Sequence, residues 1–136
     1  MNTSGIPAVG GAYIVFLKCS SVKNIRVGSL GTIKTREGFY AYCGSACGPG
    51  GLRARLSRHL KTGKKCRWHI DYIRRHMKAE GVVFSTGMTE HELAEKLALL
   101  GGVIPMKGFG SSDCSCAAHL YFFEALPAEF SVELVR

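Results

Sequence analysis

Short runs of apolar residues recur along the chain and predict a set of β-strands. The first run, residues 12–17 (AYIVFL), is apolar at every position, which is typical of a buried strand. The run FYAYC at residues 39–43 follows a turn at Glu37-Gly38 and predicts the second main strand. Shorter strands are expected at residues 25–27, 31–33, 82–84 and 119–123.

Apolar residues spaced three and four apart predict three helices between these strands, over residues 52–61, about 69–79 and 89–100. Thr89 is expected to open the third helix, and Gly101 to end it. The positions expected to face the core are Leu52, Leu56, Leu60, Ile70, Ile73, Met77, Leu93, Leu97 and Leu100. The pattern predicts an α+β or mixed α/β fold, a small sheet flanked by helices.

The length of 136 residues suits a single domain. Residues 1–10 are rich in Gly, Pro and Ser and are expected to form a flexible lead, with one domain over residues 11–136. With 46% hydrophobic and 21% charged residues, the composition is that of a globular protein and excludes a disordered chain.

The start of the chain lacks the pattern of a signal peptide, and its longest apolar run is far shorter than the ~20 residues of a membrane-spanning helix. The six cysteines are unevenly clustered, which favours reduced thiols over a disulfide framework. We therefore expect a cytoplasmic protein without a membrane segment.

The charge is strongly positive: 18 Lys and Arg against 10 Asp and Glu give a formal net charge of +8. Ten of these 18 cations lie between Arg53 and Lys78, where Asp71 is the single acid. This clustering predicts a surface that binds a polyanion, nucleic acid before membrane. The residues assigned to that surface are Arg53, Arg58, Lys61, Lys64, Lys65, Arg67 and Trp68.

Arg55 and His59 lie within about 60° of Leu52 on a helical wheel, so both are expected beside the apolar stripe and close to the sheet. A guanidinium is a natural clamp for a phosphodiester, and an imidazole can move protons near neutral pH. A solvated basic face is the alternative interpretation of this helix.

Several motifs in this order resemble the GIY-YIG nucleases, and more closely their Uri-type single-domain branch. They are Gly11-Ala12-Tyr13, RVGSLG at 26–31, GFYAYCGSA at 38–46, GGLRARLSRHL at 50–60, WHIDY at 68–72 and GFGSSDCSC at 108–116. The resemblance spans about residues 11–123. It implies a small, mostly antiparallel sheet with about three helices, and metal-assisted hydrolysis of a phosphodiester, usually in DNA.

The resemblance also implies roles for individual residues. Tyr13 and Tyr42 would lie side by side on paired strands, and Tyr13 would orient or deprotonate the attacking water. Arg55 would hold the scissile phosphate. His59 would relay a proton or contact a neighbouring phosphate.

The reaction implied by the resemblance requires Mg²⁺ or Mn²⁺ and therefore a carboxylate ligand. The third helix carries three glutamates. On a helical wheel with Leu93 at zero, Glu90 lies at about 60°, close to the inward Leu97 at about 40°. Glu92 and Glu95 lie on the outward side. Glu92 also completes a capping box with Thr89. We expect Glu90 to hold the metal, with Glu92 as the second candidate.

Two further clusters carry titratable side chains. In residues 68–72 (WHIDY), His69 or Asp71 is expected to bond to nearby backbone in a structural role, with catalysis as the alternative. Cys114, Cys116 and His119 are three candidate ligands for a structural Zn²⁺. Three functions therefore stay open: a nuclease, a non-catalytic nucleic-acid-binding module and a zinc-stabilised structural domain. The sequence predicts no particular protein partner.

Overall fold

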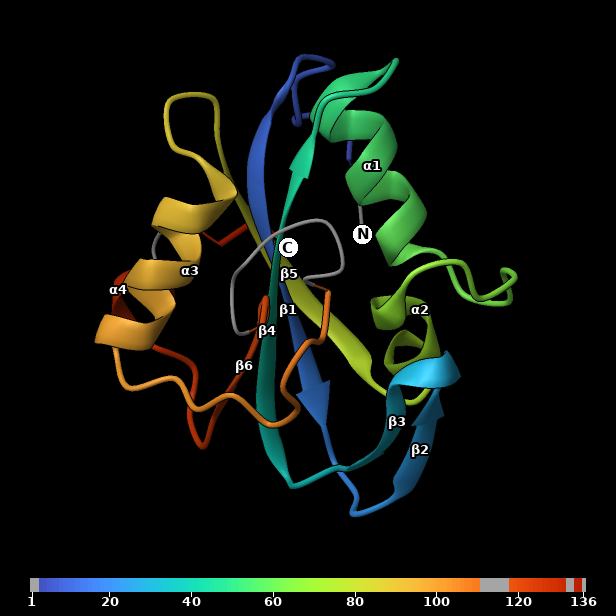
Figure 1. Ribbon diagram of the computed structural model, residues 1–136. Helices are drawn as coiled ribbons and strands as arrows, with labels where there is room; N and C mark the ends of the chain where they lie inside the picture. The colour runs from blue at the N-terminus through green and yellow to red at the C-terminus, as the bar shows by residue number, and fades with distance from the viewer. Residues whose placement is uncertain (1–2, 111–117, 132–133, 136) are drawn as a thin grey trace.

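The computed structural model describes residues 3–110, 118–131 and 134–135. A mixed α/β domain results, with one antiparallel four-stranded sheet between two layers of helices (Figure 1). In chain order the elements are β1 (Gly11–Cys19), β2 (Asn24–Val27), β3 (Gly31–Lys34), β4 (Gly38–Ala46), α1 (Gly51–Leu60), α2 (His69–Arg74), β5 (Lys78–Ser85), α3 (Glu90–Leu99), β6 (Leu120–Phe123) and α4 (Ala128–Ser131). The predicted fold class is confirmed.

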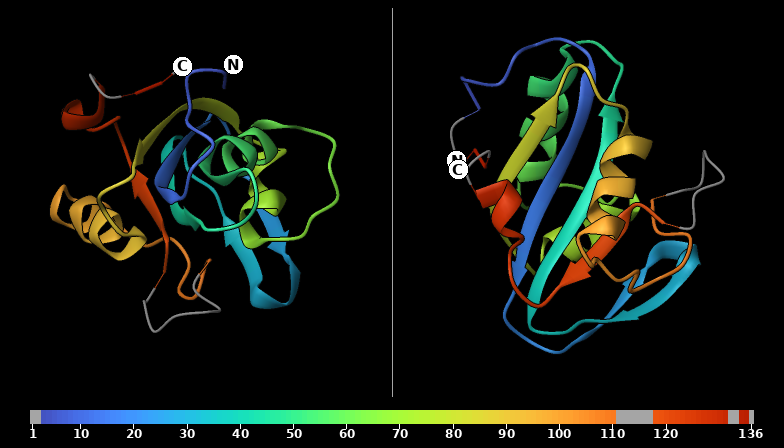
Figure 2. Two further views of the ribbon diagram at one scale, coloured as in Figure 1. Left: turned by 90° about the horizontal axis from the view of Figure 1, so that it is seen from above. Right: turned by 90° about the vertical axis from the view of Figure 1, so that its left-hand side faces the viewer.

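The sheet has the strand order β5-β1-β4-β6, and β2 and β3 form a separate hairpin. Helices α1 and α2 cover one face of the sheet, while α3 and α4 cover the other (Figure 2). Side chains of β1 alternate between the two cores: Tyr13 and Val15 join the cluster under α1 and α2, and Ile14 and Phe16 join the cluster under α3 and α4. Burial on both faces explains why the run over residues 12–17 is apolar throughout.

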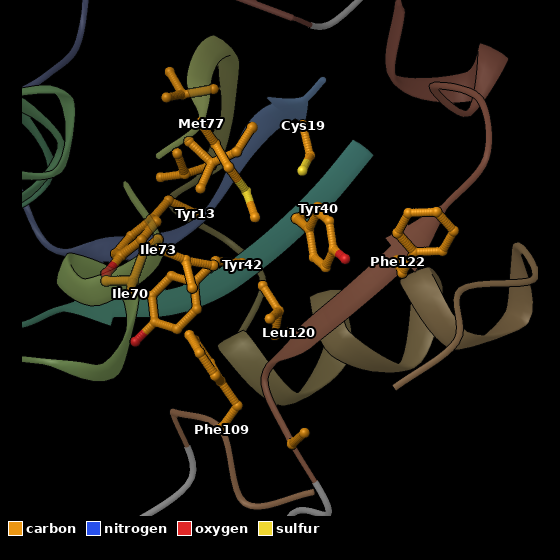
Figure 3. Packing of buried hydrophobic residues seen from close by; sticks show 14 of the residues in the cluster. Tyr13, Cys19, Tyr40, Tyr42, Ile70, Ile73, Met77, Phe109, Leu120 and Phe122 are labelled. Atoms are coloured by element: carbon orange, nitrogen blue, oxygen red, sulfur yellow. The ribbon is translucent and has the colours of Figure 1, made fainter. Parts of the chain in front are cut away.

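The register of β1 and β4 places both predicted tyrosines on one face. Tyr13 pairs with Gly44, and Val15 pairs with Tyr42, so the two tyrosines are diagonal neighbours across the strand pair. Their hydroxyl groups point to the same side of the core cluster (Figure 3). The predicted side-by-side placement is therefore confirmed.

The second helix is shorter than predicted, because α2 ends at Arg74 and β5 begins at Lys78. Arg74 is buried, and its guanidinium donates hydrogen bonds to the carbonyl oxygens of His59, Leu60 and Met77. These bonds fix the backbone at the end of α2. The residues that follow pair with β1 and form β5. Tertiary contacts outweigh the helical pattern that extended to residue 79.

The described part of the segment before β1 packs against α1 at several points, and the flexibility expected of residues 1–10 stays a prediction. Ile6 is buried, and the carbonyl oxygens of Pro7 and Val9 accept hydrogen bonds from the backbone N–H groups of Arg53 and Leu52. A Cβ on Gly51 would lie 2.7 Å from the Val9 nitrogen, so the glycine permits this close approach.

In the described part of the chain, no helix is long and apolar enough to cross a membrane.

Candidate active site

A pocket of about 300 Å³ opens where β4 extends beyond the start of β6. Strand β6 pairs with residues 39–42 of β4, and the continuation of β4 through Gly44 and Ser45 forms part of the pocket wall. The remaining walls come from β1, α1, the start of α2, the start of α3 and the segment before β6. The lining residues are Tyr13, Tyr42, Gly44, Ser45, Arg55, Arg67, Trp68, His69, Glu90, Gly110 and His119.

Tyr13 is buried and is hydrogen-bonded to His59, with 2.7 Å between its hydroxyl oxygen and Nε2. Burial raises the pKa of Tyr13, while the nearby charge of Arg55 acts in the opposite direction. Burial lowers the pKa of His59 to about 3, so its imidazole is neutral near pH 7. The phenol of Tyr13 is thus protonated and in contact with a neutral base.

His59 lies behind Tyr13 and is 1% exposed. Of the two roles expected of His59, this burial favours the proton relay over contact with a neighbouring phosphate, because α1 turns the side chain into the core. Its Nδ1 has no hydrogen-bond partner within the described residues. His59 can therefore act on a ligand in the pocket only through its hydrogen bond to Tyr13.

Tyr42 packs its ring edge-on against His59 and Phe109, at 5.8 and 6.1 Å between ring centroids. Burial is the main cause that raises the pKa of Tyr42, and Tyr13 adds to it. Tyr42 is therefore a protonated hydroxyl on the pocket wall.

Arg55 is held at the pocket by contacts with Ser45, Trp68 and the Tyr13 hydroxyl. Its Nη1 donates to the carbonyl oxygen of Ser45 at 3.0 Å, and its Cζ lies 4.6 Å from the ring centroid of Trp68. The guanidinium retains further N–H groups, because these contacts use only part of its donor capacity. A preorganised cation on the wall is suited to an anionic ligand.

Asp71 connects the pocket wall to α1. Its buried carboxylate accepts hydrogen bonds from Nη1 and Nη2 of Arg58, at 3.0 and 2.9 Å, and from the backbone N–H groups of Arg67 and Trp68. The guanidinium of Arg58 also lies 4.1 Å from the Trp68 ring centroid. The structural role expected of Asp71 is confirmed, and Arg58 is an internal ion-pair partner rather than a free surface cation.

Glu90 and Glu92 occupy different environments on α3. Glu90 lines the pocket, and its Oε2 lies 3.5 Å from Nδ1 of His119. Glu92 is exposed and completes the predicted capping box: its carboxylate accepts from the Thr89 N–H, and its own N–H donates to the Thr89 hydroxyl. Of the two carboxylates, the structure brings Glu90 into the pocket with Tyr13 and Arg55.

The remaining predicted cations differ in exposure, and among them only Arg67 lines the pocket in the described structure. Lys61, Lys65 and Arg67 are exposed. Lys64 donates to the carbonyl oxygen of Lys61, and Arg53 to that of Ile6. The Trp68 ring packs against Arg55, Arg58, Arg67 and His59.

The zinc prediction involves residues that the structure describes only in part. Cys114 and Cys116 lie outside the described residues, and His119 lies in the pocket beside Glu90. Within residues 3–110, 118–131 and 134–135, no group of three or more His, Cys, Asp or Glu side chains is placed to hold a metal ion.

Sequence reasoning did not name Gly44, Ser45 or Gly110 as pocket residues, gave His69 catalysis only as the alternative to a structural role, and assigned His119 to zinc. The bond expected between His69 and nearby backbone is present, since its Nδ1 accepts from the N–H of Gly110 at 2.8 Å. Gly110 is 41 positions away from His69 in sequence. The motifs WHIDY and GFGSSDCSC contain the two residues, but nothing in the sequence pairs them.

Gly44→Ala is expected to lower both stability and any activity of the pocket. A Cβ at Gly44 would lie 2.7 Å from Cζ of Tyr13, whose ring is buried and has no room to retreat. We expect a loss of about 1–3 kcal/mol in unfolding free energy, measured by urea denaturation. Gly87→Ala is the control, because a Cβ there meets no described atom within 4 Å. Equal stability of the two variants would contradict the close packing of Tyr13 on Gly44.

Comparison with known proteins places these residues in a family. A family model with the description domain of unknown function DUF123 matches residues 12–135, a range that includes every residue of the pocket wall. No curated protein and no solved structure matches the chain at the significance that we required. The chain therefore belongs to the DUF123 family, which is a GIY-YIG-like family.

Proposed function

We propose that the protein is a divalent-metal-dependent endonuclease that hydrolyses phosphodiester bonds in DNA. One observation carries this proposal: Tyr13, Tyr42, Arg55 and Glu90 converge on a single pocket of about 300 Å³. A guanidinium can bind the phosphate, a carboxylate can hold a divalent ion and a phenol can bond the attacking water, so these groups suit metal-assisted phosphodiester hydrolysis. The order of the motifs further supports membership of the Uri-type branch.

The pair of Tyr13 and His59 provides the path for the proton. With Nδ1 of His59 protonated, the Tyr13 hydroxyl donates to Nε2. Its oxygen also interacts with Arg55, and a lone pair remains to accept a hydrogen bond from the attacking water.

As the water oxygen bonds to phosphorus and the bond from phosphorus to the leaving oxygen breaks, the water proton moves to Tyr13 and the Tyr13 proton moves to Nε2 of His59. The leaving oxygen takes up a proton from solvent. His59 is neutral before the step, because burial lowers its pKa to about 3. The same burial makes it a weak base, so it holds the proton only transiently.

Arg55 and Glu90 supply the electrostatic part of the reaction. Arg55 binds the phosphate and stabilises the charge that develops on its oxygens. Glu90 is a partly exposed carboxylate on the pocket wall, and one or two carboxylates with several waters are the usual ligands of Mg²⁺ in such enzymes. The residues present thus fit a hydrated Mg²⁺ or Mn²⁺, held by Glu90 with the imidazole of His119 beside it. When bound, such an ion supplies Lewis-acid stabilisation of the phosphate and of the leaving oxygen.

The direct test is cleavage of labelled single-stranded, duplex and branched DNA and RNA, each with Mg²⁺, Mn²⁺ or EDTA. We expect metal-dependent cutting of DNA that EDTA abolishes. Binding without cutting under every condition would replace the nuclease with a non-catalytic nucleic-acid-binding module. Zinc in the purified protein, with neither activity, would favour the zinc-stabilised structural domain.

Affinity for DNA is expected to fall with salt, because exposed cations around the pocket displace counterions from phosphates. The slope of log affinity against log salt should be ~0.7–0.9 per phosphate neutralised. Reversal of two exposed charges, Lys65→Glu with Arg67→Glu, should flatten this slope, as measured by fluorescence anisotropy.

The control reverses two exposed charges that do not line the pocket, Lys18→Glu near the end of β1 with Lys34→Glu at the end of β3. Both double variants change the net charge equally, so a difference in slope reports location. Equal slopes would show that only overall charge matters and that the cations near the pocket are ordinary solvated surface.

A further inference from the structure

His69 occupies the pocket wall at the start of α2, and one of its two ring nitrogens is already engaged. Its Nδ1 accepts a hydrogen bond from the N–H of Gly110 at 2.8 Å. The ring is also held by Phe109, which is fully buried, at 5.5 Å between centroids. These contacts fix both the position of the imidazole and its orientation.

The bond from Gly110 determines the tautomer of the ring. A backbone N–H only donates, so the nitrogen that it meets must offer a lone pair. Nδ1 is therefore unprotonated, and the neutral ring carries its hydrogen on Nε2. Nε2 makes no hydrogen bond to any described residue and is not sealed from solvent. A donor of fixed direction is thus available at the pocket wall.

We propose that His69 is a further catalytic residue, a neutral imidazole whose Nε2–H donates a hydrogen bond to a non-bridging oxygen of the scissile phosphate. This inference rests on the proposed function and adds a second donor beside Arg55. No proton is transferred by His69, because a neutral imidazole acts here only as a fixed donor. Its contribution grows as negative charge accumulates on the phosphate oxygens.

The surroundings of His69 favour its neutral form. The titratable groups that share the pocket are Arg55 from α1, Arg67 from the segment before α2, Glu90 from α3, His119 from the segment before β6, and Tyr13 and Tyr42 from the sheet. Burial lowers the pKa of His69. Protonation of Nδ1 would also place its N–H against the backbone N–H of Gly110, which would break the hydrogen bond between them. The donor is therefore neutral at pH 7 and is lost when acid protonates the ring.

Three substitutions at His69 distinguish the role of Nδ1 from the role of Nε2. Glutamine retains a donor near the position of Nε2, asparagine retains a polar group near Nδ1, and alanine retains neither. We expect His69→Ala and His69→Asn to lower kcat/KM roughly 10- to 100-fold, the scale of one hydrogen bond to a charged group. His69→Gln should retain most of the activity, and its loss of activity in acid should be weaker than in the wild type. His76→Gln, at an exposed histidine, is the control and should change nothing.

A measurement without catalysis distinguishes this inference from the proposed function. Nitrogen-15 NMR in EDTA should show His69 Nδ1 unprotonated, and thymidine dinucleotide, which has a single phosphodiester, should shift the Nε2 signal. A protonated Nδ1, or an Nε2 signal that the dinucleotide leaves unchanged, would overturn the role of His69 whether or not DNA is cut. Full activity in His69→Asn with none in His69→Gln would also overturn it, because the bond to Gly110 would then be the whole contribution. Absence of cleavage by the wild type refutes the nuclease itself and leaves the NMR result to decide on His69 as a phosphate donor.

Discussion

Tyr13→Phe and Glu90→Gln are each expected to reduce DNA cleavage by roughly 100-fold or more while leaving DNA affinity within a few-fold. Both substitutions preserve the shape of the side chain. The first removes the hydroxyl that bonds to Nε2 of His59, and the second removes the carboxylate charge from the pocket wall. Proton-transfer and metal roles typically contribute effects of this size. Single-turnover cleavage and equilibrium binding, measured on the same duplex, would separate the two quantities.

Arg55→Ala provides an internal comparison, because its guanidinium would hold the phosphate in the ground state and in the transition state alike. Both affinity and cleavage should therefore fall. Glu92→Gln is the matched control for Glu90→Gln: it lies two positions away on α3 and caps the helix, so it should cost only ~1 kcal/mol of stability. Cleavage abolished by Glu92→Gln but not by Glu90→Gln would show that the other carboxylate holds the metal.

The contrast between Glu90 and Glu92 was predictable from sequence because it depends only on helix geometry. The spacing from Leu93 and Leu97 determines which glutamate faces inward, and Thr89 with Glu92 forms a capping box wherever a helix starts. The placement of Tyr13 beside Tyr42 was predictable for a similar reason, since side chains alternate along two paired strands. Periodicity alone determines these features.

Features that depend on contacts distant in sequence were not predictable in this way. The position of Arg55 and His59 on α1 followed from the wheel, but the depth to which the core buries His59 depends on how Trp68 and Tyr42 pack around it. The early end of α2 depends on Arg74 reaching the carbonyl oxygens of α1. The bond between His69 and Gly110 requires the complete fold.

Asp71→Asn is expected to lower the unfolding free energy by about 3 kcal/mol at pH 7. The side chain of Asp71 is 1% exposed, and that of Arg58 is 26% exposed. Removal of one partner from such a pair leaves the other charge poorly compensated. The substitution also disturbs the acceptor of the backbone N–H groups of Arg67 and Trp68, which form the pocket rim. Urea denaturation followed by circular dichroism measures the loss.

The same carboxylate should make stability depend on pH. Burial alone would raise the pKa of Asp71, but hydrogen bonds from Arg58 and from the backbone of Trp68 and Arg67 outweigh it, and the pKa lies below its ordinary value of 3.8. The folded state therefore binds this proton less readily than the unfolded state. The stabilisation is present above about pH 4 and is lost as the pH falls through the folded-state pKa. The difference between wild type and Asp71→Asn should accordingly be constant from pH 5 to 8 and shrink below pH 4.

Glu124→Gln is the matched control, because Glu124 forms an ion pair with Arg36 in which both side chains are largely exposed, at 84% and 60%. Exposed pairs contribute about 0–1 kcal/mol, so this variant should remain close to the wild type. Salt should weaken the small effect at Glu124 more than the larger effect at Asp71, because the Asp71 carboxylate is 1% exposed and is therefore screened much less. If both variants lost the same small amount of stability, Asp71 would be an ordinary surface acid in solution. The rim formed by Arg67 and Trp68 would then need another anchor.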